Sequence, residues 1–306
     1  MCALNEVKGM KLYMKDYFGY KDKVCVVTGA SSGMGKATVE MLVDLGASCY
    51  AVDLNPCDVK GIKDFIKCNL SKKEDIDNLF SKLPEHIDCF FGVAGLSGSK
   101  TDYMTTFNCN YTANFYITEE YLTKRISKGG SIVYVTSTAG LNWKEFRKEQ
   151  SKVVNASTWE EVESVVEPLA KISPATFAYM YSKRCLSEYA SDASIKLGKQ
   201  GIRVNNVMPG STDTGMKDEF EKMAGGEEAL LAETGVAHRL AESVEMAGPI
   251  VFLGSSMASF ISGVDLCVDY ADNALKTLGY KQDREKVPAT NKFILKMAKK
   301  MMEKNK

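Results

Sequence analysis

Histidine is scarce and cysteine pairs are absent from this sequence. Its 306 residues include only His86 and His238, and its nine cysteines form no CxxC pair. A structural zinc site needs four closely spaced Cys or His ligands, so we expect no metal. The odd number and wide spacing of the cysteines also argue against a disulfide framework. We therefore expect reduced thiols in a cytoplasmic protein, where most of them act as small hydrophobic side chains.

Long hydrophobic runs and a net charge are also missing. No run approaches the roughly 20 apolar residues that a membrane span needs, and the first twenty residues do not resemble a signal peptide. The chain has 39 basic and 39 acidic side chains, so its overall charge favours neither nucleic acid nor an anionic membrane as a partner. The balance is uneven, because residues 281–306 hold nine basic and three acidic side chains.

Short apolar runs alternate with longer amphipathic segments from residue 23 onward. This alternation predicts an α/β fold, in which right-handed crossovers build one doubly wound parallel sheet, a Rossmann fold. Strands are expected within 24–29, 48–54, 87–95, 130–140 and 202–214, and helices over 35–47, 75–83, 107–126 and 177–198.

Three segments fall outside this pattern. We expect an N-terminal extension over 1–22, a catalytic domain over 23–272 with a helical insertion at about 141–176, and a C-terminal arm over 273–306. In the arm, Ile294, Met297 and Met301 follow helical spacing between lysines. Such a basic amphipathic helix could dock on the body or a neighbouring subunit, stay solvated, or contact a membrane surface.

A glycine-rich turn follows the first expected strand and opens the first expected helix, over residues 28–35. Glycines permit the tight turn and let backbone N–H groups approach a pyrophosphate at the helix N-terminus. Asp53 ends the next strand, where a carboxylate accepts both ribose hydroxyls and repels a 2′-phosphate. Lys36 lies past the phosphate-binding turn. The pattern predicts NAD(H) rather than NADP(H).

A YxxxK pair lies in the last long helix. Tyr179 and Lys183 are four residues apart and share a helix face. A nearby ammonium lowers the pKa of a phenol, which otherwise titrates near 10, and so fits it for acid–base work. Ser137 leaves the carboxyl end of a strand, where ligands bind in such sheets. Asn110 lies within the long helix expected over 107–126.

These motifs together resemble the short-chain dehydrogenase/reductase family. The TGxxxGxG turn, the strand-end Asp, the Asn–Ser–Tyr–Lys set and the loop over 209–214 occur in the family's order, and the resemblance covers about 23–272. It implies that Tyr179 is the general acid/base, that Lys183 lowers its pKa and binds the nicotinamide ribose, that Ser137 bonds the substrate oxygen, and that Asn110 holds a relay water. The implied cofactor contacts are Gly29, Ser31, Ser32, Met34, Gly35, Asp53, Leu54, Asn69, Leu70, Ala94, Gly95, Leu96, Tyr179, Lys183, Pro209, Gly210, Thr212 and Thr214.

Three positions depart from the family pattern. The turn after the fourth strand reads Gly-Val-Ala-Gly over 92–95, Asn69 stands where the adenine contact is usually Asp, and the last strand ends Asp-Tyr-Ala over 269–271. These departures affect local contacts and leave the catalytic set intact. Tyr181 competes with Tyr179, but it is two residues from Lys183 and faces another side of the helix.

The segment between Ser137 and Tyr179 is longer than is usual in the family. Thr158 or Ser157 can cap a helix there, with Glu161 or Glu160 three residues later. Trp159, Val162, Val166 and Leu169 then share one face. This helix could roof a large apolar substrate or repack a subunit interface. An insertion at this place is similar to that of the 3α-hydroxysteroid dehydrogenase/carbonyl reductase branch.

The resemblance implies an NAD(H)-dependent oxidoreductase that interconverts a secondary alcohol and a ketone, with a hydroxysteroid or bile-acid-like substrate. A smaller carbonyl, sugar or acyl-derived substrate is one alternative, and a non-catalytic dinucleotide sensor is another. Residues 215–240 are expected to form a mobile flap over the substrate, although Met216 and Met223 could equally be ordinary helix packing. The family typically forms dimers or tetramers, so a homo-oligomer is expected, with no nucleic-acid partner and no membrane span.

Overall fold

A seven-stranded parallel sheet forms the centre of the molecule in the computed structural model, which describes residues 16–282. The strand order is β3-β2-β1-β4-β5-β6-β7. The order reverses between β1 and β4, which is the crevice where ligands bind in doubly wound folds. The predicted fold class is therefore confirmed. The strands are β1 (Val24–Thr28), β2 (Ser48–Asp53), β3 (Asp64–Lys67), β4 (Ile87–Gly92), β5 (Ile126–Val135), β6 (Arg203–Pro209) and β7 (Asp265–Val268).

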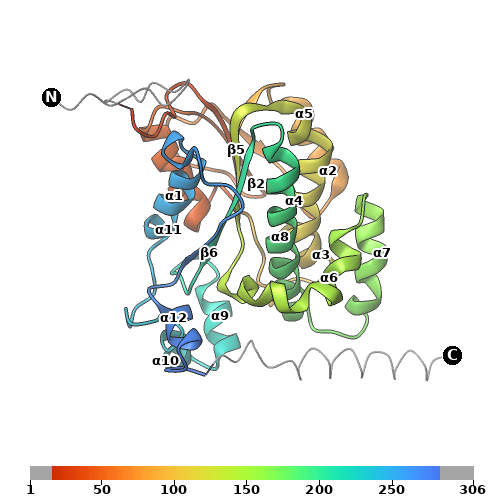
Figure 1. Cartoon of the computed structure of the whole chain (residues 1–306), viewed down its shortest axis with the longest axis vertical. Helices are drawn as coiled ribbons and strands as arrows, with labels where there is room; N and C mark the ends of the chain where they lie inside the picture. The colour runs from red at the N-terminus through yellow and green to blue at the C-terminus, as the bar shows by residue number, and fades with distance from the viewer. Residues whose placement is uncertain (1–15, 283–306) are drawn as a thin grey trace.

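Helices cover both faces of the sheet (Figure 1). On one face, α1 (Gly33–Asp44) and α11 (Ser243–Gly254) pack around Val27, Phe91 and Val133. On the other face, α2 (Lys73–Lys82), α4 (Ala113–Tyr116) and α8 (Ala175–Gly198) pack around Val26, Phe90 and other apolar residues. Because both faces are buried, β1 and β4 read as nearly continuous apolar runs, as parallel sheets require.

The long helix expected over 107–126 is a chain of shorter helical pieces. It begins with α3 and continues through two π-helical turns, and Asn110 lies in the first of them. A π-turn widens the helix locally and often marks a functional site. The pieces are α3 (Tyr103–Phe107), η1 (Asn108–Thr112), α4 (Ala113–Tyr116), η2 (Ile117–Leu122) and α5 (Thr123–Arg125).

The insertion forms an outer layer of helices: η3 (Thr138–Phe146), α6 (Arg147–Val154) and α7 (Trp159–Ala170). The predicted helix and its cap are confirmed, since the Glu161 backbone N–H donates to Thr158 Oγ1 at 3.1 Å and the Ser157 N–H donates to Glu161 Oε2 at 2.7 Å. Trp159 is buried and its ring meets that of Tyr116 edge-on, with centroids 5.8 Å apart.

Most of the remaining helices gather at one end of the molecule. Three short helices, α9 (Lys217–Ala224), α10 (Glu227–Leu231) and α12 (Asp272–Thr277), lie together at the lower end in Figure 1. The single turn η4 (Ser256–Ala258) follows α11. Tyr20, from the expected N-terminal extension, is buried and donates to the Val251 carbonyl at 2.6 Å. Ile294, Met297 and Met301 of the expected arm lie outside the described residues. No helix in 16–282 is long and apolar enough to cross a membrane.

Candidate active site

The glycine-rich turn brings the N-terminus of α1 against the end of β4. Gly29 has a φ of +71°, and a Cβ there would lie 2.8 Å from Ala94 Cα. A Cβ at Gly35 would lie 1.9 Å from the Gly29 carbonyl oxygen. Neither position can hold a larger residue without moving backbone. The turn therefore opens a groove of about 340 Å³ in front of the helix N-terminus, where its free N–H groups favour an anion.

Asp53 lies at the end of β2 and lines this groove. Its Oδ2 accepts from the Ser31 backbone N–H at 3.1 Å, and its Oδ1 accepts from the Asn55 N–H at 2.9 Å. Both bonds fix the carboxylate in the wall of the groove. There it can accept the hydroxyls of a ribose.

None of the described residues that line the groove is a lysine or an arginine. The nearby Lys36 does not line the groove, and its Nζ pairs with Asp58 Oδ1 at 2.7 Å. A 2′-phosphate carries extra negative charge and needs a cation near the adenosine ribose. The groove instead presents the Asp53 carboxylate, which suits an unphosphorylated ribose.

Two thiols complete the groove wall, and sequence reasoning missed both. Cys68 and Cys109 line the groove directly before Asn69 and Asn110 in the chain. Burial raises the pKa of each thiol to about 12, so both stay neutral. Their positions directly before the predicted site residues Asn69 and Asn110 could have indicated them in the sequence. The other lining residues that were not predicted are Gly33, Asn55, Val93, Gly215 and Met216.

Lys183 lies enclosed in the protein on α8, one turn after Tyr179. Its Nζ donates to the Val135 carbonyl at 2.8 Å and lies 5.8 Å from the centre of the Tyr179 ring. A Cβ at Gly95 would lie 3.4 Å from the same Nζ. Burial lowers the pKa of Lys183 to about 8. The ammonium therefore stands behind the tyrosine, between the ends of β4 and β5.

Asn110 ties the loop after β4 to helix α8. Its Oδ1 accepts from the Leu96 N–H at 2.8 Å, and its Nδ2 donates to the Leu96 carbonyl at 2.9 Å and to Ser182 Oγ at 3.2 Å. Ser182 Oγ in turn donates to the Tyr179 carbonyl at 2.8 Å. The buried amide is thus fully engaged, and it fixes the backbone on both sides of the Tyr–Lys pair.

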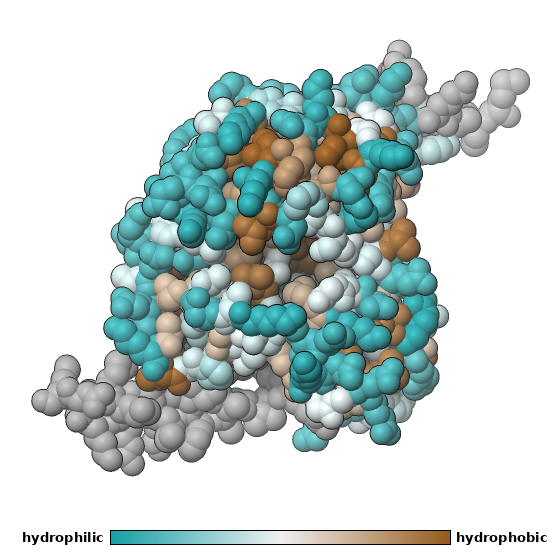
Figure 2. All heavy atoms as spheres, turned by 180° about the vertical axis from the view of Figure 1, so that it is seen from behind, coloured by the Kyte–Doolittle hydropathy of each residue, from teal (hydrophilic) through white to brown (hydrophobic). Residues whose placement is uncertain are grey.

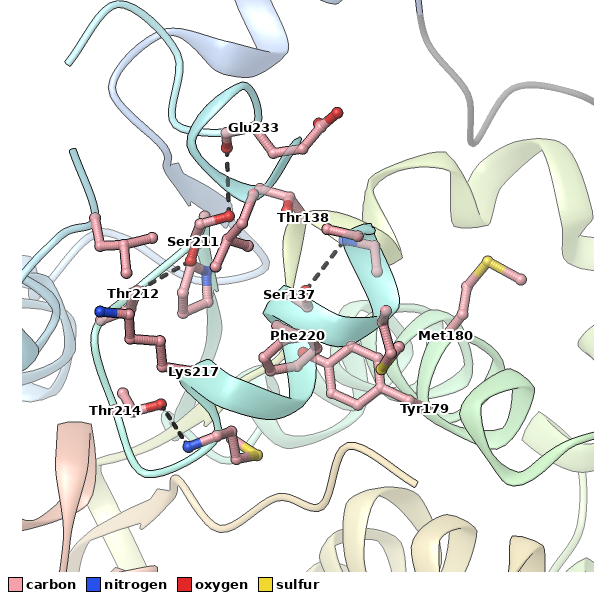
Figure 3. A pocket seen from close by; sticks show the side chains of 18 of the residues that line it. Ser137, Thr138, Tyr179, Met180, Ser211, Thr212, Thr214, Lys217, Phe220 and Glu233 are labelled. Carbon is pink, nitrogen blue, oxygen red and sulfur yellow. Dashed lines mark hydrogen bonds between the residues drawn. The ribbon is translucent and has the colours of Figure 1, made fainter. Parts of the chain in front are cut away.

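Ser137 is the N-cap of η3, just beyond the end of β5, and its Oγ accepts from the Ala139 N–H at 3.2 Å. Ser137 and Tyr179 both line a second cavity, of about 520 Å³. Figure 3 shows Tyr179 beside Phe220, with Ser137 next to them. The two rings meet edge to face, with centroids 5.3 Å apart. A substrate oxygen between Ser137 and Tyr179 would have two hydroxyl partners.

Most of the second cavity is apolar. Its wall comes from the end of the insertion, from α8 and from the segment after β6, and Figure 2 shows a hollowed face with apolar side chains inside the hollow. The insertion contributes only Pro174 and Thr176 to the cavity wall, and Phe177 follows directly after it. Helices α6 and α7 lie away from the cavity, which does not support the idea that they roof the substrate. The apolar wall is Phe177, Met180, Met216, Phe220, Met223, Leu230 and Leu240.

The groove and the cavity meet, because Met34, Thr214 and Met216 line both. A dinucleotide with its adenosine at Asp53 would therefore place its other end beside Ser137 and Tyr179. Of the predicted cofactor residues, Ser31 and Lys183 line neither space, and Pro209, Gly210, Thr212 and Tyr179 line the substrate side. Those that line the groove are Gly29, Ser32, Met34, Gly35, Asp53, Leu54, Asn69, Leu70, Ala94, Gly95, Leu96 and Thr214.

Comparison with known proteins agrees with this geometry. Residues 29–270 match the family model described as enoyl-(acyl carrier protein) reductase. Coniferyl-alcohol dehydrogenase of Pseudomonas sp. (strain HR199 / DSM 7063) is 33% identical over 255 residues, which cover 81% of this chain and 95% of that protein. Dehydrogenase/reductase SDR family member 6 of Danio rerio is 26% identical over 267 residues, covering 81% and 96%.

Solved structures show the same fold at low identity. The 3-alpha-hydroxysteroid dehydrogenase from Pseudomonas sp. B-0831, complexed with NADH, superposes with a TM-score of 0.67 at 20% identity and covers 85% of this chain and 100% of that one. A 4-hydroxyisoleucine dehydrogenase complexed with NADH gives a TM-score of 0.64 at 23% identity, covering 83% and 99%.

Proposed function

The chain belongs to the short-chain dehydrogenase/reductase family, and from that premise we propose that it interconverts an apolar alcohol and its carbonyl compound with NAD(H). One observation carries the proposal: Tyr179, with the Lys183 ammonium behind it and Ser137 beside it, faces a cavity that joins a dinucleotide groove. A non-catalytic sensor would not need this set of side chains.

The chain's own residues handle the proton. In alcohol oxidation, Tyr179 takes the proton of the substrate hydroxyl while Ser137 bonds the same oxygen. The positive charge of Lys183 favours the phenolate form of Tyr179. Asn110 holds helix α8 and the loop after β4 in fixed positions relative to each other. Bound NAD⁺ supplies the acceptor for the hydride that leaves the carbinol carbon. In the reverse direction Tyr179 returns the proton.

We propose NAD(H) over NADP(H) because of the charge around the adenosine end. Asp53 is fixed there by two backbone N–H groups, and Lys36 is paired with Asp58. A 2′-phosphate would face this carboxylate, and the described residues of the groove wall include no lysine or arginine to offset the repulsion.

The cavity supports a bulky substrate. A volume of about 520 Å³ falls within the range of sites for drug-sized ligands, and its wall is largely apolar. One part of the wall is charged, where Lys276 pairs with Glu233 at 3.0 Å and with Asp272 at 2.7 Å. A hydroxysteroid or bile-acid-like alcohol, with a rigid apolar body and a second polar group, suits this wall better than a small alcohol does.

An aromatic alcohol is a second candidate, because a coniferyl-alcohol dehydrogenase is 33% identical over most of both chains. Its substrate would place a flat ring among Phe177, Met180 and Phe220. The carbinol would then be primary and the product an aldehyde. The proton chemistry of Tyr179 is the same for both candidates.

A substrate panel tests the proposal. Purified protein is assayed for NADH formation with 3-hydroxysteroids, bile acids, coniferyl alcohol and short aliphatic alcohols, with NAD⁺ and NADP⁺ in parallel. We expect turnover of a bulky alcohol with NAD⁺. Turnover of small alcohols alone would refute the proposed substrate class. A preference for NADP⁺ would refute the proposal that Asp53 selects NAD(H).

We also propose that the protein is a homo-oligomer, as the family resemblance implies. Helices α6 and α7 lie outside the substrate cavity, so the insertion is better placed for a subunit interface than for a roof. Analytical ultracentrifugation would measure the mass. A monomer at micromolar concentration would count against the proposal.

A further inference from the structure

Helix α9 forms part of the cavity wall but is poorly anchored to the body. None of its residues from Lys217 to Ala224 is buried. Its inner side nevertheless carries Phe220, which meets Tyr179, and Met223, which lines the cavity. A segment with little buried surface opens at low cost in free energy. The helix therefore has the properties of a lid, and something must hold it over the site.

Opposite α9 lies the loop between β4 and α3. Its first part, Ala94 to Leu96, lines the dinucleotide groove, and Asn110 bonds both backbone groups of Leu96. The next residue, Ser97, is 2% exposed. This loop is thus a fixed edge of the site, directly connected to one of the predicted catalytic residues.

One side chain of α9 reaches across to this loop. Glu219 Oε2 accepts hydrogen bonds from Ser97 Oγ and, at 2.7 Å, from Ser99 Oγ. Its Oε1 pairs with Lys100 Nζ at 2.7 Å. The Glu219 side chain is only 13% exposed, whereas that of Lys100 is 72% exposed. The serine bonds are therefore the substantial part of the contact, since an exposed lysine contributes little.

The charge state of Glu219 fits this arrangement. Burial raises the pKa of its carboxyl, but the hydrogen bonds from Lys100, Ser97 and Ser99 outweigh that effect and hold the pKa below its usual value. The group is therefore an ionised acceptor at neutral pH, and hydrogen bonds to an ionised group are stronger than neutral ones.

We propose that Glu219 is a latch: by bonding Ser97 and Ser99 it holds α9 closed over the cavity, and it is a positioning residue for Phe220 and Tyr179. The proposal rests on the proposed function, because the lid closes over the site assigned there. The latch joins the substrate wall to the edge of the cofactor groove, so opening it exposes both sites together. Release of the latch then governs how fast ligands leave.

The test compares Glu219→Ala and Glu219→Gln with Asp218→Ala, a matched control on the exposed side of the same helix. We expect Glu219→Ala to raise KM for the best alcohol by about tenfold, the effect of losing one or two charge-assisted bonds. NADH should dissociate several-fold faster in stopped-flow fluorescence, while kcat changes less than KM. Asp218→Ala should match the wild type in each measurement.

A second readout needs no substrate. Lys217 and Lys222 lie in α9, so trypsin should cut there faster in Glu219→Ala than in Asp218→Ala. Circular dichroism first verifies that both variants are folded. The double variant Ser97→Ala/Ser99→Ala should give the same acceleration, and adding Glu219→Ala to it should add little. Equal cleavage in all variants would overturn the latch, even if no alcohol is turned over. Turnover with unchanged KM and NADH release would also overturn it, while the proposed function would stand.

Discussion

The ammonium of Lys183 lies 5.8 Å from the centre of the Tyr179 ring, held by the Val135 carbonyl at 2.8 Å. The two residues are one helical turn apart on α8. The hydrogen bond to the Val135 carbonyl fixes the position of the Lys183 ammonium relative to the Tyr179 ring. Because the lysine is enclosed by protein, its charge is poorly screened by water. Tyr179 therefore faces the cavity with a fixed positive charge behind it.

Replacing Tyr179 with Phe should remove the proton donor and leave the fold intact. We expect kcat to fall by about 10²–10⁴-fold, the usual contribution of general acid–base catalysis, while NADH still binds. Tyr181→Phe is the matched control. Its hydroxyl donates to the Glu149 carbonyl at 3.3 Å and its ring packs on Phe107, away from Lys183. Steady-state kinetics and NADH fluorescence titration measure both; a large loss in Tyr181→Phe would mean that the wrong tyrosine was assigned.

Lys183 should make stability depend on pH. Burial lowers its pKa to about 8 in the folded protein, against about 10.4 in an unfolded chain. Between these values the unfolded chain binds more protons, so the free energy of unfolding rises with pH, by on the order of 3 kcal/mol from this group. Buried tyrosines and cysteines with raised pKa values act in the opposite direction, as Tyr111 and Cys185 do.

The variant Lys183→Met separates these contributions, because it keeps the other titrating groups. Denaturant unfolding of the cofactor-free protein at pH 7, 8, 9 and 10 should show wild-type stability gaining on that of Lys183→Met as pH rises. Parallel curves would contradict a lowered lysine pKa.

Much of this architecture follows from local patterns in the sequence. The fold class, the glycine turn, Asp53 and the capped helix α7 each depend on residues close together in the chain. Strand β3 was not predicted, because only Phe65 and Ile66 are apolar in it and both of its ends are exposed. The π-turn at Asn110 was missed for a related reason, since side-chain periodicity does not distinguish a π-turn from an α-helix.

The substrate side could be predicted less well than the cofactor side. Tyr179 and Lys183 form a helical pair visible in the sequence, whereas Phe220 reaches Tyr179 only through the path of the chain after β6. The link between Glu219 and Ser97 spans 122 residues and has no sequence signal. Contacts between loops depend on tertiary packing, and no local rule predicts them.

Cofactor choice should depend on Asp53. In Asp53→Ser we expect KM for NAD⁺ to rise by about 10- to 100-fold, because truncating a charged hydrogen-bond partner costs about 2 kcal/mol or more, and discrimination against NADP⁺ to shrink. Lys36→Met is the control: its ammonium pairs with Asp58 outside the groove, so cofactor preference should stay unchanged. The ratio of kcat/KM for the two cofactors measures the effect. A switch of preference in Lys36→Met alone would show that the lysine, not the carboxylate, reads the ribose.

Helix α7 should matter for stability and not for substrate binding. Trp159 is 4% exposed and packs edge-on against Tyr116, so Trp159→Ala should cost about 3–5 kcal/mol of unfolding free energy. No residue of α7 lines the cavity, so KM of the folded variant should equal that of the wild type. Glu167→Ala serves as the control on the exposed face, where its ion pair with Lys171 contributes little. Thermal unfolding and steady-state kinetics separate the two effects. A raised KM with unchanged stability would place the insertion at the substrate after all.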